Sequence, residues 1–319
     1  MSKMNLETRI RSMKRADLSK VVEGWNETFV FDEVDEEKFE RTVFGDLNYE
    51  RDGTLVAEDE GEIVGFASCV AREGVLGKDG KGTEQEKDKG YLKGIFYQDE
   101  DIGRALLERI EEFLRSRGKS VVKVVKYGGG VYFFPGIDLR YKRLLRFFKQ
   151  NDFEETGQLQ DVSLDLEKYQ PEQGEYQRKQ WKRVKSEGME IVSYRPDMLP
   201  QMQEFVPRLN ILQWFGPDWK KDWEKRENTV VAVKDNRILG YASYRPAPKG
   251  SDTGGFGSIG ALPSERGKGI GTCMMDECMH RLKEAETKIV IARWANTPFY
   301  LKSGWEVCRE YAVFEKKIS

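Results

Sequence analysis

The 319-residue sequence contains no long apolar run, no excess of charge of one sign, and few cysteines or histidines. No stretch approaches the roughly 20 apolar residues that span a bilayer. Residues 1–15 are too charged to form the apolar core of a secretory signal. Lysine and arginine total 53 against 55 for aspartate and glutamate, so the net charge of −2 offers no footprint for nucleic acid or anionic lipid. We therefore expect a cytoplasmic protein with no membrane and no nucleic-acid partner.

The four cysteines and the single histidine form no recognisable reactive or metal-binding group. The cysteines show neither a CxxC pair nor zinc-finger spacing. Without an export signal, we expect them to be reduced and packed as small hydrophobic side chains. His280 falls on a predicted helix and is interpreted as a surface or packing residue. We therefore expect no metal and no cysteine nucleophile.

The sequence does contain an internal repeat. Residues 54–68, TLVAEDEGEIVGFAS, align without a gap on residues 229–243, TVVAVKDNRILGYAS. In each copy two short apolar runs flank a polar turn, which is typical of a β-hairpin. Because further matches keep the same order along the chain, we infer two related domains. These matches pair 15–18 with 195–198, and 147–154 with 299–306.

The repeat predicts how the chain is divided. We expect residues 1–170 to form the first domain, 171–188 a polar linker, and 189–319 the second domain. Within each domain, hairpins alternate with predicted helices such as 269–285, which indicates an α/β domain with one central sheet. The basic stretch 178–185 lies in the expected linker. We interpret it as a solvated helix face, with a binding patch as the alternative.

A glycine-rich segment, RGKGIG, runs from Arg266 to Gly271 after a predicted strand. Three glycines in five positions let the backbone approach a ligand closely and direct successive N–H groups toward it. The following helix adds the positive end of its dipole, and Arg266 and Lys268 add positive charge. A Walker loop is excluded because GxxxxGKS and GxxxxGKT are absent, and a dinucleotide-binding strand because the segment follows a hairpin. The segment is therefore expected to bind a pyrophosphate.

The R-x-x-G-x-G spacing from Arg266 to Gly271 resembles the Gln/Arg-x-x-Gly-x-Gly/Ala coenzyme A signature of the GNAT N-acetyltransferase superfamily. Downstream, Asn296 precedes a Y-x-x-x-G-W segment that begins at Tyr300. This is similar to the family's asparagine and tyrosine-containing helix, although the asparagine lies about one turn closer. The resemblance implies two tandem GNAT-like domains, each with a mixed, mostly antiparallel central sheet flanked by helices.

The resemblance also implies an activity. Acetyl-CoA would be the cosubstrate, and its acetyl group would pass directly to a primary amine of a small molecule or peptide. Tyr300 would protonate the departing thiolate as general acid, with a packed aromatic as the alternative. The strand before the loop carries no carboxylate, so no general base is assigned. The residues implied to bind the coenzyme are Ala261, Leu262, Arg266, Gly267, Lys268, Gly269, Ile270, Gly271, Thr272 and Asn296.

The matching segment of the first domain, residues 98–103, lacks the glycine-rich run. Three consecutive acidic residues, 99–101, stand where a pyrophosphate would bind and would repel it. The position of Tyr300 is occupied by Phe148. We therefore expect a degenerate first copy whose coenzyme binding is weakened or lost.

The acceptor amine is expected to enter near Trp214, Trp219 and Trp223, three tryptophans within one short segment. Since Trp219 and Trp223 are one helical turn apart, packing in the core is the alternative to lining a pocket. For the protein as a whole, the alternative to an enzyme is a non-catalytic acyl-CoA-binding or assembly module.

Overall fold

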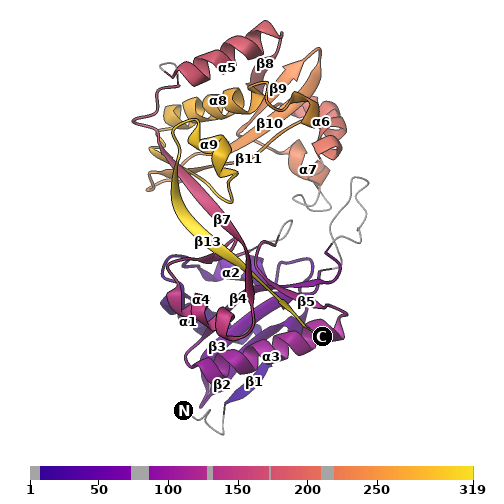
Figure 1. Cartoon of the computed structure of the whole chain (residues 1–319), viewed down its shortest axis with the longest axis vertical. Helices are drawn as coiled ribbons and strands as arrows, with labels where there is room; N and C mark the ends of the chain where they lie inside the picture. Colours follow the sequence, from indigo (N-terminus) through magenta and orange to yellow (C-terminus); the bar gives the residue numbers. More distant parts are fainter. Residues whose placement is uncertain (1–7, 73–85, 128–131, 172–173, 210–218, 319) are drawn as a thin grey trace. The chain divides into compact units, whose positions relative to one another are not determined.

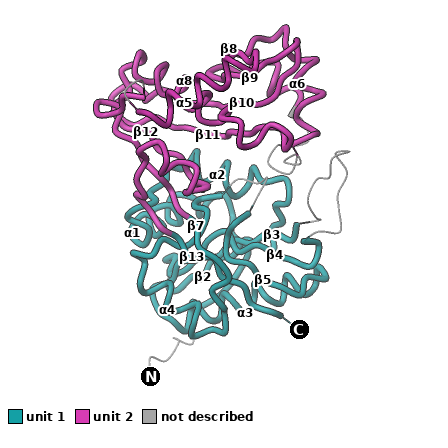
Figure 2. The backbone as a smooth tube through the Cα atoms, turned by 45° about the horizontal axis from the view of Figure 1, so that its top comes forward, with its two compact units in different colours: residues 1–76, 81–159, 311–319 teal, residues 77–80, 160–310 magenta. Residues whose placement is uncertain are grey.

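The computed structural model describes residues 8–72, 86–127, 132–171, 174–209 and 219–318. They form two compact α/β units, drawn in teal and magenta in Figure 2. Among the described residues, unit 1 comprises 8–72, 86–127, 132–159 and 311–318, and unit 2 comprises 160–171, 174–209 and 219–310. None of the helices in the described ranges is both long and apolar enough to cross a membrane.

In unit 1 the sheet order is β1-β2-β3-β4-β5-β13 (Figure 1). All neighbours pair antiparallel except β4 and β5, which are parallel. The elements of unit 1 are β1 (Arg9–Ser12), α1 (Leu18–Thr28), α2 (Glu36–Val43), β2 (Thr54–Asp59), β3 (Glu62–Val70), β4 (Lys89–Tyr97), α3 (Glu100–Ser116), β5 (Val121–Val124), β6 (Ile137–Asp138), α4 (Lys142–Gln150) and the start of β7 (Glu154–Asp165).

In unit 2 the sheet order is β7-β12-β11-β10-β9-β8, again antiparallel except for one parallel pair, β11 and β12. The expected mixed, mostly antiparallel sheet flanked by helices is therefore confirmed. The elements of unit 2 are α5 (Glu175–Ser186), β8 (Glu190–Ser193), α6 (Leu199–Phe205), α7 (Trp219–Glu224), β9 (Thr229–Lys234), β10 (Arg237–Arg245), β11 (Thr253–Ala261), α8 (Ile270–Glu284), β12 (Ile289–Ala292), α9 (Thr297–Leu301) and the start of β13 (Glu306–Lys317).

The repeated sequence forms the hairpins β2–β3 and β9–β10, one in each unit. The threonine that opens each repeat stands opposite the serine that closes it. Thr54 and Ser68 are hydrogen-bonded through their hydroxyls at 3.3 Å, and Thr229 and Ser243 at 2.9 Å. The shared Thr and Ser are thus explained by one buried cross-strand pair in each hairpin.

The last strand of the chain belongs to unit 1, not to the second domain expected at 189–319. Residues 314–317 of β13 pair with β5, and Phe314 lies in the core of unit 1. Correspondingly, the end of β7 pairs with β12, and Val162 lies in the core of unit 2. The expected boundary at residue 170 also differs, because unit 2 begins at residue 160.

The expected linker, residues 171–188, contains α5, which packs on α8 within unit 2 (Figure 1). Val184 is buried in the unit 2 core, and Trp181 packs against that core. These two apolar residues lie three apart on a helix whose other positions are mostly charged. The segment is therefore a structural part of unit 2.

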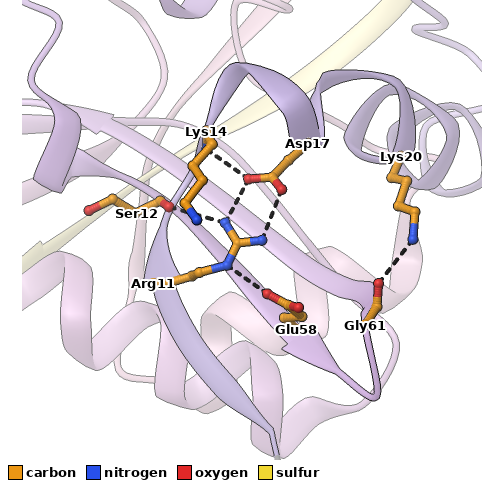
Figure 3. A network of polar contacts seen from close by, with 7 residues as sticks. All are labelled: Arg11, Ser12, Lys14, Asp17, Lys20, Glu58 and Gly61. Carbon is orange, nitrogen blue, oxygen red and sulfur yellow. Dashed lines mark hydrogen bonds and ion pairs between the residues drawn. The ribbon is translucent and has the colours of Figure 1, made fainter.

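A polar network secures the edge strand β1 in unit 1 (Figure 3). Arg11 donates hydrogen bonds to both carboxylate oxygens of Asp17, at 2.6 and 2.9 Å, and one to Glu58 on β2 at 2.6 Å. The pKa of Asp17 is lowered, chiefly because its carboxylate accepts these bonds from Arg11. Since β1 has only one strand neighbour, these bonds supplement its backbone pairing with β2.

A charged pair is buried inside unit 1, where β4 carries an extra residue opposite β3. Lys93 occupies this bulge and is 1% exposed. Its ammonium donates to Asp46 Oδ2 at 2.6 Å and to the carbonyl of Thr42. Asp46 also accepts from the Tyr127 hydroxyl at 3.1 Å and from the backbone N–H of Asn48 at 2.9 Å. Burial lowers the pKa of Lys93, and the Asp46 carboxylate opposes that shift.

We predict that Asp46→Ala lowers the free energy of unfolding by about 3–5 kcal/mol, because it leaves the Lys93 ammonium buried without its counterion. Denaturant titration at neutral pH measures the change. The matched control is Asp197→Ala, which removes an exposed carboxylate paired with Arg195 at 3.1 Å and is expected to cost under about 1 kcal/mol. Equal costs for the two variants would contradict the role assigned to the buried pair.

Candidate functional site

The candidate site in unit 2 begins where two parallel strands separate. β11 pairs with β10 over most of its length but with β12 only from Thr253 to Gly255. Beyond Gly255, the edge of β11 that faces away from β10 has no strand partner among the described residues. A bulge at this point places both Gly257 and Ser258 opposite Ser243 of β10. Bulges next to an unpaired edge re-aim backbone groups and are common beside active sites.

The direction of the backbone groups on this edge follows from one hydrogen bond. The N–H of Leu262 donates to the carbonyl of Leu239 at 2.9 Å, toward β10. Because backbone groups alternate along a strand, the N–H groups of Ile259 and Ala261 point to the open edge instead. The N–H group of Ala261 is therefore open to a ligand, whereas that of Leu262 is already engaged with β10. Leu262 is buried, and its carbonyl also accepts a bond, from Glu265 N at 2.8 Å.

The glycine-rich loop follows directly and ends at the first turn of α8. Gly267 and Gly269 adopt left-handed φ values of 76° and 90°, which favour glycine. Gly269 is the N-cap of α8 and has no side chain to cap the helix. Local sequence therefore sets both the turn and an uncapped helix start.

This conformation leaves a series of donors free. Within the described part of the chain, five backbone N–H groups between residues 267 and 272 donate no hydrogen bond. They are Gly267, Gly269, Ile270, Gly271 and Thr272. A set of N–H groups converging at a helix N-terminus is a binding site for a phosphate group. This is the geometric fit between the loop and a coenzyme that carries a pyrophosphate.

The two cationic side chains of the loop, Arg266 and Lys268, differ in their ion pairing. Arg266 is exposed, whereas Lys268 forms an ion pair with Glu265 at 3.0 Å. The hydrogen bond from Lys268 is the main cause of the lowered pKa of the Glu265 carboxyl. Among the residues that the structure describes, Arg266 has no ion-pair partner and Lys268 is partly neutralised by Glu265.

Tyr300 lies on α9, the short helix that follows β12, and is 5% exposed. Its ring packs against Phe256 of β11 at 6.1 Å and against Trp305 at 5.1 Å between ring centroids. The hydroxyl makes no hydrogen bond to any residue that the structure describes. Burial raises the pKa of Tyr300, so the hydroxyl keeps its proton at neutral pH. The hydroxyl therefore carries a proton that no described residue engages, but the raised pKa makes it a weaker acid than an ordinary tyrosine.

α9 also contacts the first turn of α8. A Cβ atom added to Gly271 would lie 3.2 Å from the Phe299 ring and 3.9 Å from Ile259. Asn296 is exposed, and its side chain does not cap α9. The open edge of β11, the glycine-rich loop and α9 thus lie next to one another, and Asn296 is the N-cap residue of α9.

Of the three expected acceptor tryptophans, the structure describes the side chain of Trp223 alone. Trp214 lies outside the described residues, and Trp219 is the first residue of α7. Trp223 is fully buried, with its ring against Tyr194 at 5.4 Å and Tyr241 at 5.3 Å. Packing in the core therefore accounts for Trp223, and it does not line an open pocket.

A hydroxyl pair that the sequence did not reveal lies at the bulge. Tyr241 of β10 donates to Ser258 Oγ at 2.7 Å, and burial raises the pKa of Tyr241. Only cross-strand pairing brings these two residues together. Asp252, the nearest carboxylate in sequence before the loop strand, forms an exposed ion pair with Lys288 at 3.1 Å.

The corresponding place in unit 1 is closed by its own side chains. Asp99 caps α3, accepting a hydrogen bond from the N–H of Asp101 at 2.8 Å. The carboxylate thus occupies the helix start where unit 2 has free donors. Phe148, at the position of Tyr300, is fully buried. A Cβ atom on Gly94 of β4 would lie 2.6 Å from the Trp25 ring, so aromatic packing fills the adjoining space.

Three of the four cysteines lie in the cores of the two units, and Cys308 is exposed. Burial raises the pKa of the Cys273 thiol to about 12, and also raises the pKa values of Cys69 and Cys278. Those three thiols are therefore protonated at neutral pH and are poor nucleophiles. Within the described ranges, no group of three or more His, Cys, Asp or Glu side chains is placed to hold a metal ion.

Comparison with known proteins identifies the same two regions. The model of the acetyltransferase (GNAT) family matches residues 18–127 and 198–305, one match in each unit. No match was found among the sequences of curated proteins.

Several solved structures share the fold of the whole chain. The GCN5-related glucosamine N-acetyltransferase region of a fungal multi-domain GH3 β-N-acetylglucosaminidase superposes with a TM-score of 0.74 and 18% identity, covering 97% of this chain and 38% of that one. A GCN5-related N-acetyltransferase from Sphaerobacter thermophilus gives 0.67 and 14%, covering 99% and 97%. A tandem GNAT protein from the clavulanic acid biosynthesis pathway gives 0.62 and 12%, covering 98% and 99%.

Proposed function

Because this chain belongs to the acetyltransferase (GNAT) family, as an acyltransferase with two tandem GNAT-like units, we propose that unit 2 binds acetyl-CoA and acetylates a primary amine. The observation that carries the proposal is the set of five unpaired N–H groups in the loop from Gly267 to Thr272. In unit 1 the equivalent helix start is capped by Asp99. We therefore propose one coenzyme site per chain.

The residues of unit 2 suggest how the coenzyme is held. The loop N–H groups would bind its pyrophosphate, with Arg266 adding charge. The open edge of β11, through Ile259 and Ala261, would bind the amide-containing arm as an added strand would be bound. When bound, acetyl-CoA supplies a thioester that an amine attacks directly.

The proposed role of the protein's own side chains is proton transfer. Tyr300 holds a proton on its hydroxyl at neutral pH, and this proton can pass to the leaving sulfur. We assign no carboxylate as general base, because the described strand β11 carries none. The acceptor is accordingly expected to react as the free amine, or to lose its proton to water.

The acceptor is proposed to be a small molecule or a peptide with a primary amine. Glucosamine belongs in the first amine panel because a fungal structural neighbour is a glucosamine N-acetyltransferase region. The competing function is a non-catalytic acyl-CoA-binding module. Release of free thiol from acetyl-CoA on addition of amines supports the enzyme, whereas CoA binding without turnover on a broad panel supports the module.

We predict that Gly267→Asp weakens CoA binding by at least about tenfold, because it places a negative charge beside the phosphate-binding N–H groups. Calorimetry measures the dissociation constant. Gly250→Asp is the matched control, since both glycines have positive φ, 76° and 85°, and open space where a Cβ atom would lie. The control should bind CoA as the unaltered protein does, and equal affinities for all three proteins would refute the loop assignment.

For Tyr300→Phe we predict a fall in kcat of about 100-fold with an unchanged CoA dissociation constant, because only the proton donor is removed. Steady-state rates with the best amine of the panel, and calorimetry with CoA, give the two quantities. Tyr91→Phe, a buried tyrosine of unit 1, is the control and should keep the full rate. An undiminished rate for Tyr300→Phe would leave Tyr300 a packing residue.

A further inference from the structure

Helix α5 is fixed firmly to α8 in unit 2. Asp276 of α8 is 3% exposed and accepts hydrogen bonds from the Tyr169 hydroxyl and from Trp181 Nε1, the latter at 3.0 Å. Val184, one turn after Trp181, is buried in the same core. The bond from Trp181 to Asp276 and the buried Val184 together hold one face of α5 against α8.

A second face of α5 lies against the glycine-rich loop. Arg183 Nη1 donates a hydrogen bond to the carbonyl of Gly267 at 2.8 Å. A Cβ atom on Gly269 would lie 2.6 Å from Gln180 Oε1, so only glycine lets the loop approach the helix so closely. Tyr176 also lies on this face, with its hydroxyl 3.4 Å from that of Thr272. Tyr176, Gln180 and Arg183 are spaced by four and three residues, as one side of a helix requires.

Arg183 keeps most of its hydrogen-bonding capacity. Of its five N–H groups, one donates to Gly267, and Nε donates to Glu187 at 3.2 Å. The other three have no partner among the described residues, and the side chain is 48% exposed. A planar guanidinium with free donors, held beside five unpaired loop N–H groups, is the side chain best suited to bind a phosphate.

We propose that α5 forms one wall of the coenzyme site and that Arg183 binds the phosphates of CoA directly. This inference rests on the proposed function and extends it, because Arg183 lies outside the glycine-rich signature. The basic stretch 178–185 then has two parts. Arg183 is directed to the loop by its bond to Gly267, whereas Lys182 lies about 100° away around the helix and faces solvent.

The experiment measures CoA dissociation constants by calorimetry at low and high ionic strength, for the unaltered protein and for Arg183→Gln, Arg183→Lys and Lys182→Gln. Arg183→Gln is expected to weaken binding by about 10- to 100-fold, the loss typical of a hydrogen-bonded charge. Its binding should also depend less on salt, because one phosphate-bound cation is gone. Arg183→Lys should retain most of that salt dependence. Lys182→Gln, with the same charge change, should match the unaltered protein.

Measurements with dephospho-CoA, which lacks the 3′-phosphate, show which phosphate group Arg183 binds. If Arg183 binds the 3′-phosphate, Arg183→Gln and the unaltered protein will bind dephospho-CoA equally; if it binds the pyrophosphate, the loss will persist. An Arg183→Gln affinity within about twofold of the unaltered value overturns the inference and leaves the proposed function standing. The inference is also overturned if Arg183→Gln and Arg183→Lys lose the same affinity and neither changes the salt dependence of CoA binding. Arg183 would then act only by holding the Gly267 carbonyl. No CoA binding by the unaltered protein would remove both proposals.

Discussion

The separation of β11 from β12 after Gly255 is the constraint on which the site in unit 2 depends. Two parallel strands that stayed paired would satisfy every backbone group of β11 and leave nothing for a ligand. Because they part, the groups of Ile259 and Ala261 face an open edge, and α9 lies beside that edge with Tyr300 against Phe256. β11 also continues directly into the glycine-rich loop. The same strand therefore positions the open edge, the phosphate-binding N–H groups and, through Phe256, Tyr300.

The equivalent region of unit 1 has the same strands but is closed by side chains. Both units contain the repeated hairpin with its Thr–Ser pair, and in both a parallel strand pair separates after a few residues. The units differ at one helix start and in the aromatic side chains Phe148 and Trp25 that fill the adjoining space of unit 1. A left-handed Gly269 leaves the first N–H groups of α8 free, whereas in α3 the carboxylate of Asp99 accepts a hydrogen bond from the N–H of Asp101. In unit 1 the bulge of β4 holds the buried Lys93–Asp46 ion pair.

α5 gives unit 2 a feature that its duplicated elements do not supply. It precedes the repeated hairpin, yet its side chains reach the loop on one face and Asp276 on another. A loop with two left-handed glycines is conformationally free when isolated, and the Arg183–Gly267 bond restrains it. The wall formed by α5 thus holds the loop in the conformation that exposes its N–H groups.

Patterns within short stretches of sequence determined much of this description. The hairpins and the helix after the glycine-rich loop follow from periodicity, turn residues and glycines, which act over a few neighbours. The duplication followed from the internal repeat, and the mixed sheet was implied by the resemblance to a known family. The loss of the loop in unit 1 was also readable, because three adjacent carboxylates repel an anion wherever the chain folds.

Only the tertiary structure decided which distant segments meet. The apolar patterns of β7 and β13 are compatible with either sheet, so their assignment to β12 and β5 depends on long-range pairing. The alternation that directs Ile259 rather than Leu262 to the open edge depends on its β10 partner. Likewise, Trp223 has the spacing of a pocket or of a core, and only packing against Tyr194 and Tyr241 distinguishes them. Local sequence sets the conformation of each segment, but burial and pairing between segments far apart in the chain select its neighbours.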